Sequence, residues 1–153
     1  MIRELTSEED QVKKQAFSYL ARRAFFREEL SVKLVQKGFS KEGIDKVLDL
    51  CSKQGFLDDR KLTRQLVEKA RDRGFGSKAI WCKLCYRVGI NRSVLQQVIL
   101  DTEKTQLVSL QKLIQKKSHQ IQLSDPKQKS RLIAKMLRRG YCYEEIMRCL
   151  AEV

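Results

Sequence analysis

The chain has little of what most enzymes and membrane proteins require. Its 153 residues include one proline, one histidine and one tryptophan. No run approaches the ~18 apolar residues of a transmembrane helix, and the N-terminal segment lacks the apolar centre of a signal peptide. We therefore expect a cytoplasmic protein that does not insert into a membrane. His119 has no paired nucleophile and no phosphate-binding glycine motif occurs, so we expect no enzymatic activity and no cofactor.

The five cysteines form no recognisable framework. An odd number of thiols in a reducing compartment argues against disulfides. Cys82 and Cys85 are spaced C-x-x-C, which is compatible with a zinc ligand pair, a redox dithiol or two ordinary helical thiols. A structural zinc needs four ligands, and no second C-x-x-C occurs. A redox thiol needs a helix N-terminus after a strand, whereas Cys82 lies more than a turn inside a helix. We therefore expect ordinary thiols and no metal.

Acidic residues are also few, since 19 of them face 32 lysines and arginines. The resulting formal charge of +13 favours an acidic partner. Nucleic acid, an anionic membrane surface and an acidic protein groove all have that chemistry. The basic excess grows toward the C-terminus.

Alternating strand patterns are missing, and apolar residues recur every three or four positions. In segment 59–73 one helical face is apolar, and Gly74 ends the helix because glycine adopts a left-handed conformation without steric cost. The opposite face is expected to hold Lys61, Arg64, Glu68 and Arg71. Helix N-caps are predicted at Ser7, Ser40, Ser77 and either Asp58 or Asp59. The pattern predicts an all-α protein with about nine helices.

Three glycines recur at a constant interval of 51 residues: Gly38, Gly89 and Gly140. An apolar residue follows each, and apolar residues recur six, nine and ten positions later. Two equal intervals indicate an internal repeat. We predict a tandem array of three three-helix repeats over residues 1–55, 56–101 and 102–153. Such an array is expected to be elongated and curved, because each unit buries an apolar flank only against its neighbours.

The segment "GFLDDRKLTRQLVEKARDRGFGSKAIWCKLCYRVGI", residues 55–90, resembles the central stretch of the RecX family of RecA regulators. It shares a Gly-aromatic-Leu-Asp-Asp corner, a basic helix, a Gly-aromatic-Gly turn and a helix ending in Gly-Ile. The upstream "SYLARRAFFREELSVKLVQKGFS" and the terminal "RRGYCYEEIMRCL" are also similar. Trp81, the two middle cysteines and one extra residue before Gly89 depart from the family pattern.

This resemblance implies a fold of tandem three-helix repeats that binds in the groove of the RecA–DNA filament. It also implies inhibition of strand exchange, ATP hydrolysis and coprotease activity. The expected partner is therefore a RecA filament on DNA, with weak direct nucleic-acid binding and a monomeric state. Two other functions remain open: a DNA- or RNA-binding helical protein that does not need RecA, and a thiol enzyme that uses Cys82 and Cys85.

The basic helical faces supply the candidate site residues. In segment 126–138 an apolar face of Leu132, Ile133, Met136 and Leu137 is expected to point inward, opposite an arc of cations that contains no acid. Charged faces are often only solvated, but the single sign of this one favours a polyanionic partner. The candidate filament- or DNA-binding residues are Lys61, Arg64, Arg71, Lys83, Arg87, Lys127, Arg131, Lys135, Arg138 and Arg139.

Overall fold

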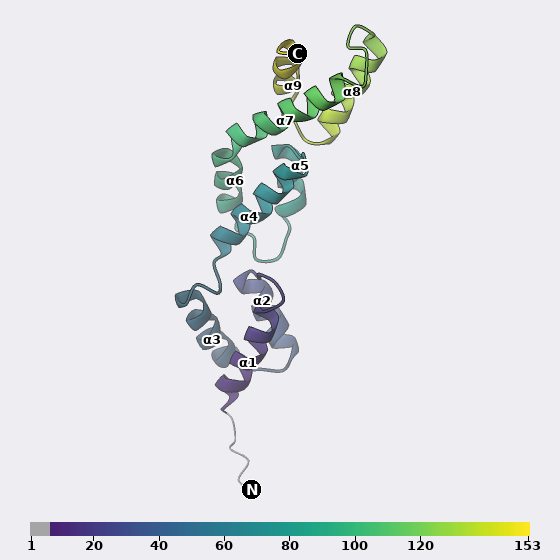
Figure 1. Cartoon of the computed structure of the whole chain (residues 1–153). Coiled ribbons are helices and arrows are strands. Elements are labelled where there is room, and N and C mark those ends of the chain that lie inside the picture. The colour runs from purple at the N-terminus through teal and green to yellow at the C-terminus, as the bar shows by residue number, and fades with distance from the viewer. Residues whose placement is uncertain (1–6) are drawn as a thin grey trace. The chain divides into compact units, whose positions relative to one another are not determined.

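The computed structural model describes residues 7–153, and within that range it contains nine α-helices and no β-strand (Figure 1). The helices are α1 (Glu8–Leu20), α2 (Arg27–Gln36), α3 (Lys41–Lys53), α4 (Asp59–Asp72), α5 (Ser77–Leu84), α6 (Arg92–Asp101), α7 (Glu103–Ser118), α8 (Pro126–Arg138) and α9 (Tyr143–Ala151). The predicted all-α helical-repeat fold is confirmed. None of these described helices is both long and apolar enough to cross a membrane.

The first compact unit runs to Leu62 and includes Val88–Ile90. Helices α1, α2 and α3 pack against one another in it. Its core residues are Val12, Ala16, Phe25, Leu30, Leu34, Ile44, Val47, Leu48, Cys51 and Leu57. Phe17 and Phe56 add an edge-to-face contact with ring centroids 5.3 Å apart. Apolar residues at helical spacing thus form a complete small core within about the first third of the chain.

The second compact unit comprises Thr63–Arg87 and Asn91–Val153. Helices α7, α8 and α9 share a core of Leu110, Ile114, Leu132, Met136, Tyr141, Ile146 and Cys149. Helices α4, α5 and α6 contribute the buried residues Val67, Ile80, Leu95 and Val98. The division into repeats at residues 1–55, 56–101 and 102–153 stays a prediction.

The glycines that recur every 51 residues occupy the same kind of turn. Gly38, Gly89 and Gly140 have φ angles of 89°, 86° and 92°, in the left-handed region that favours glycine. Each lies in the turn between two helices, α2–α3, α5–α6 and α8–α9. The residues six positions after them are all buried: Ile44, Leu95 and Ile146. The periodicity of the sequence therefore reflects one recurring helix–turn–helix geometry.

Two turns of the second unit are joined through their main chains. The Gly76 amide donates to the Arg139 carbonyl at 2.7 Å, and the Lys78 amide donates to the Gly140 carbonyl at 3.2 Å. A Cβ added to Gly140 would lie 2.6 Å from the Ala79 Cβ, well inside van der Waals contact. The α4–α5 turn and the α8–α9 turn can approach this closely only because glycines stand at both positions.

Most predicted helix caps are present, with one exception. The side chains of Ser7, Ser40 and Asp58 accept hydrogen bonds from the amides of Asp10, Gly43 and Lys61. The prediction that Ser77 caps α5 is wrong. Gly76 occupies that position, and the Ser77 hydroxyl donates instead to the Gln106 side chain at 2.6 Å.

Helix α5 is also shorter than the sequence suggests. It ends at Leu84, although apolar residues at helical spacing continue to Val88, which is 52% exposed. Cys85 follows directly as the C-cap and is buried, at 7% exposure.

Candidate functional site

The best-supported candidate surface is a hollow between the end of α7 and helix α8, which we call the α7–α8 hollow. It has a volume of about 370 Å³. Its lining contains three cations and no acid: Lys117, Gln120, Ile121, Gln128, Arg131, Leu132 and Lys135. Three positive charges beside one another without a counter-charge attract an anionic ligand.

Helix α8 orients these cations through its opposite, buried face. Pro126 stands at the first turn, where its missing N–H costs nothing, and the Asp125 side chain accepts from the Lys127 amide at 2.9 Å. Leu132 and Met136 are 5% and 1% exposed, which fixes the inward side of the helix. The exposed cations of α8 are Lys127, Arg131 and Arg138, and Lys135 is half-buried.

Leu137 does not point inward as predicted, because it is 44% exposed. It follows Leu132 by five residues, which places it about 140° around the helix axis from that core residue. An apolar side chain therefore stands beside Arg138 on the solvent side of α8.

Arg139 is not part of a free basic face. Its Nη1 donates to the carbonyl oxygens of Arg73 at 3.0 Å and Gly74 at 3.2 Å, just beyond the end of α4. Its guanidinium also lies 6.0 Å from the centre of the Phe75 ring. The side chain satisfies carbonyls that the helix end leaves without partners. Arg139 is thus held in place by α4, with its charge paired only to neutral groups.

Arg71 was predicted on the exposed face of α4, and this prediction is wrong. Its side chain is 1% exposed. Thr63 and Val67 are also buried, at 1% and 0%, so positions 63, 67 and 71 form a buried row at helical spacing. Sequence analysis missed this buried row because Thr63 and Arg71 are polar, and polar residues on a helix are expected to face solvent. Arg71 is therefore not available to a nucleic acid.

The buried guanidinium of Arg71 is enclosed by hydrogen bonds. Nε donates to Thr102 Oγ1 at 2.8 Å, and Nη1 donates to Gln106 Oε1 at 2.6 Å. Nη2 donates to the Ile99 carbonyl at 2.9 Å and to Ser77 Oγ at 3.2 Å. Burial lowers the pKa of Arg71. The guanidinium remains an organising centre that joins α4, α5, α6 and α7.

Gln106 extends this network to α9. Its Oε1 also accepts from the Ser77 amide at 2.8 Å, and its Nε2 donates to Glu145 Oε1 at 2.6 Å. Glu145 Oε2 in turn accepts from the Cys142 amide at 3.0 Å. The spacing of residues in the sequence does not predict these contacts, because the five polar side chains involved are spread over α4 to α9.

The remaining candidates lie on α4 and around α5. Lys61 and Lys83 are exposed, and Lys83 Nζ lies 3.8 Å from the centre of the Phe75 ring. Arg64 shares its charge with Asp101 at 3.3 Å and with Glu68 at 4.0 Å. Arg87 lies beyond the end of α5 and is half-buried.

The C-x-x-C pair has two different environments. Cys82 is exposed and Cys85 is buried. Among residues 7–153 no group of three or more His, Cys, Asp or Glu side chains could hold a metal ion. Burial raises the pKa of the Cys51, Cys142 and Cys149 thiols, which keeps them protonated at neutral pH.

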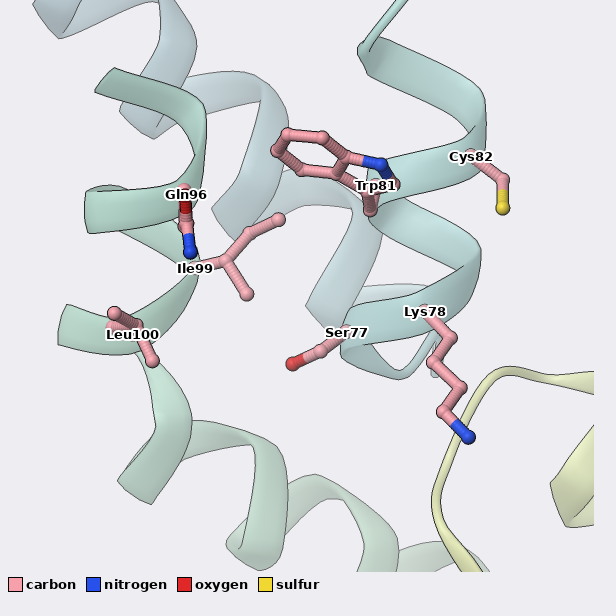
Figure 2. A pocket seen from close by; sticks show the side chains of 7 residues that line it. All are labelled: Ser77, Lys78, Trp81, Cys82, Gln96, Ile99 and Leu100. Carbon is pink, nitrogen blue, oxygen red and sulfur yellow. The ribbon is translucent and has the colours of Figure 1, made fainter. Parts of the chain in front are cut away.

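An apolar groove of about 470 Å³ lies between α5 and α6. Figure 2 shows the Trp81 indole in the space between the two helices, with Ile99 pointing toward it from α6. Cys82 and Lys78 point away from α6 in the same view. Leu100, at 60% exposure, completes an apolar surface that sequence periodicity did not indicate.

Two family models match separate parts of this chain. Residues 13–51 match the model for the first three-helix domain of RecX, and residues 105–150 match the model for the third. The curated protein "Regulatory protein RecX" of Pseudomonas entomophila (strain L48) is 28% identical over 140 residues, covering 92% of this chain and 90% of its own. The protein of the same name from Haemophilus influenzae (strain PittEE) is 27% identical over 135 residues, covering 85% of this chain and 89% of its own.

Solved structures show the same fold. The crystal structure of RecX from Lactobacillus salivarius superposes with a TM-score of 0.81 at 17% identity, covering 97% of each chain. A second crystal structure, of a regulatory protein RecX, gives a TM-score of 0.71 at 15% identity and covers 94% of this chain and 73% of that one.

Proposed function

This chain belongs to the RecX family, and we propose that it regulates the RecA recombinase, mainly as an inhibitor. It binds the RecA–DNA filament in the cytoplasm as a monomer and suppresses strand exchange, ATP hydrolysis and coprotease activity. The observation that carries the proposal is the match of both ends of the chain to three-helix domains of RecX. Its role is binding rather than catalysis.

The α7–α8 hollow supports a contact with the DNA of that filament. Arg131 and Lys135 present positive charge from α8, and Lys117 does so from α7. Phosphate contacts of this kind give affinity without sequence preference, which suits a partner that coats DNA of any sequence. Lys127 and Arg138 extend the same basic surface. The buried Arg71 and the α4-bound Arg139 are not counted among the side chains proposed to contact DNA at this surface.

The regulatory role is tested by DNA-dependent ATP hydrolysis of RecA. We expect the protein to suppress hydrolysis at well below one copy per RecA. Hydrolysis that stays unchanged at equimolar protein would refute the proposed function. Strand-exchange and coprotease assays under the same conditions measure the other two activities.

The contribution of the basic surface is tested by its salt dependence. Four changes to glutamine, at Lys127, Arg131, Lys135 and Arg138, remove four charges and leave Arg139 in place. Each phosphate contact contributes about 0.7–0.9 to the slope of log affinity against log salt. Three lost contacts therefore flatten the slope by about 2–3.

The matched control removes the same charge from exposed lysines of the first unit, at Lys14, Lys37, Lys41 and Lys46. Its filament affinity should keep a slope close to that of the unchanged protein. Equal slopes for the two variants would show that the α8 surface is only solvated.

A second function, nucleic-acid binding without RecA, is favoured by the formal charge of +13 and by the acid-free hollow. A comparison of bare DNA with RecA-coated DNA separates the two. Tighter binding to the coated strand supports the filament regulator, and equal or tighter binding to bare DNA supports the second function.

A further inference from the structure

A second cationic pocket lies between α7 and the end of α4, and we call it the α4–α7 pocket. Its volume is about 340 Å³. The lining residues are Arg71, Asp72, Arg73, Gly74, Ser109, Lys112, Leu113, Lys116 and Arg139. Three of its cations, Arg73, Lys112 and Lys116, are absent from the candidates that the sequence suggested.

Three separate elements bring these cations together. Lys112 and Lys116 are one helical turn apart on α7, so both face the same side. Arg73 directly follows α4, and Arg139 reaches the pocket from the end of α8. Arg139 is fixed by its bonds to the Arg73 and Gly74 carbonyls, which makes one wall of the pocket preorganised.

The charge of the pocket is strongly positive. Arg73, Lys112, Lys116 and Arg139 stand against a single acid, Asp72. Within residues 7–153 none of these four cations forms an ion pair with a carboxylate. Cations that converge in excess of the nearby acids repel one another, and an anion between them relieves that repulsion.

We propose that the α4–α7 pocket binds the phosphodiester backbone of a nucleic-acid strand directly, without RecA. Arg73 presents the planar donors that match phosphate oxygens, the fixed Arg139 adds positive charge to the wall, and the lysines add mobile charges at the rim. An acidic peptide would need places for its side chains, but Leu113 is the one large apolar residue in the lining. This inference rests on the second function proposed above, nucleic-acid binding without RecA, and assigns that binding to residues outside the α7–α8 hollow.

The test measures binding of a fluorescently labelled oligothymidylate strand to the purified full chain by anisotropy, at several salt concentrations and with no RecA present. The pocket variant carries Arg73→Gln, Lys112→Gln and Lys116→Gln, which spares Arg139 and its structural bonds. For a single strand each lost contact lowers the salt slope by about 0.7, so three lower it by about 2. Across a fourfold rise in salt, the unchanged protein then loses roughly 16-fold more affinity than the variant.

Matched variants separate pocket binding from charge alone. Lys14→Gln, Lys41→Gln and Lys46→Gln remove three exposed charges from the first unit and should leave the slope within one contact of the original. The charge-conserving Arg73→Lys, Lys112→Arg and Lys116→Arg variant should restore the slope.

Removal of the single acid should increase the affinity for the strand, and an increase in affinity cannot result from misfolding. Asp72→Asn should tighten oligothymidylate binding by about 1.5- to 5-fold, the range expected for one exposed charge interaction. Polyglutamate of similar charge should compete poorly, and so should inorganic pyrophosphate.

Equal slopes for the pocket and control variants would overturn the proposal, as would Asp72→Asn leaving the affinity unchanged. Full competition by polyglutamate would identify an acidic-peptide site, and full competition by pyrophosphate would identify a small-anion site; either result also overturns it. Because RecA is absent from this assay, its outcome does not depend on whether the chain inhibits RecA.

Discussion

Substitution of the buried arginine gives the sharpest test of the structure. Arg71→Ala removes hydrogen bonds to Thr102, Gln106, Ser77 and the Ile99 carbonyl at a site that is 1% exposed. The substitution leaves buried neutral acceptors without their donor, and each such unsatisfied group costs about 1–3 kcal/mol, so a total loss of about 4 kcal/mol is expected. Loss of the packed aliphatic stem acts in the same direction. The free energy of unfolding of a unit of this size is about 5–15 kcal/mol, so this change removes a large part of it.

The assay can follow the affected unit alone. Trp81 is the one tryptophan of the chain, and it lies in the second unit. Urea unfolding followed by tryptophan fluorescence therefore measures the unit that contains Arg71. With a urea dependence of about 1.5 kcal/mol per molar, a loss of about 4 kcal/mol lowers the midpoint by about 2–3 M.

Arg64→Ala is the matched control on the same helix. Arg64 pairs with Asp101 and Glu68 at the surface, where such pairs contribute about 0.2–1 kcal/mol. Its urea midpoint should therefore change by well under 1 M. If Arg71→Ala proves as mild as Arg64→Ala, then the Arg71 guanidinium does not organise this unit, and the reasoning fails.

Three further predictions concern single positions. Gly140→Ala places an alanine at φ +92° with its Cβ against Ala79, and it should lower the free energy of unfolding more than Gly38→Ala, where φ is similar but the added Cβ meets open space. Thermal unfolding of the two variants measures both losses, and equal losses would contradict the close approach at Gly140. Tyr141 Oη is buried with no hydrogen-bond partner in the described residues, so Tyr141→Phe should be neutral or stabilising by about 1 kcal/mol. Burial raises the pKa of this phenol, so the folded state disfavours its ionised form and the free energy of unfolding falls as pH rises above the unfolded pKa of about 10. Tyr141→Phe should lack that alkaline loss in urea titrations. Hydrogen bonds from the Ser40 amide and hydroxyl lower the pKa of Glu8. The stability that Glu8 contributes is therefore present above the unfolded pKa of about 4.3 and is lost as pH falls through the folded pKa. Glu8→Gln should remove this dependence of stability on acidic pH, and an unchanged pH profile would contradict the prediction.

The sequence was informative wherever apolar spacing and glycine conformation decide the structure. The recurrence of Gly38, Gly89 and Gly140 correctly located three equivalent turns, because a left-handed conformation leaves glycine as the favoured residue. The caps at Ser7 and Ser40 were also predictable, since a cap is a contact between residues three positions apart.

Contacts over long sequence distances could not be predicted in the same way. A helical wheel assigned Arg71 to solvent because charge predicts exposure, and nothing local indicated that Thr102 and Gln106 would receive it. The α4–α7 pocket was also missed because it is formed by residues far apart in the sequence. Lys112 and Lys116 already share a face of α7, but Arg73 joins them only through packing in three dimensions.

The placement of the core residues also governs how the chain assembles in time. One core is made from residues 12–57 and another from residues 110–149, so each joins side chains that are close along the chain. Helical units with such local contacts fold in microseconds to milliseconds, whereas a ribosome adds about 5–20 residues per second. The first core therefore forms before the last has been synthesised.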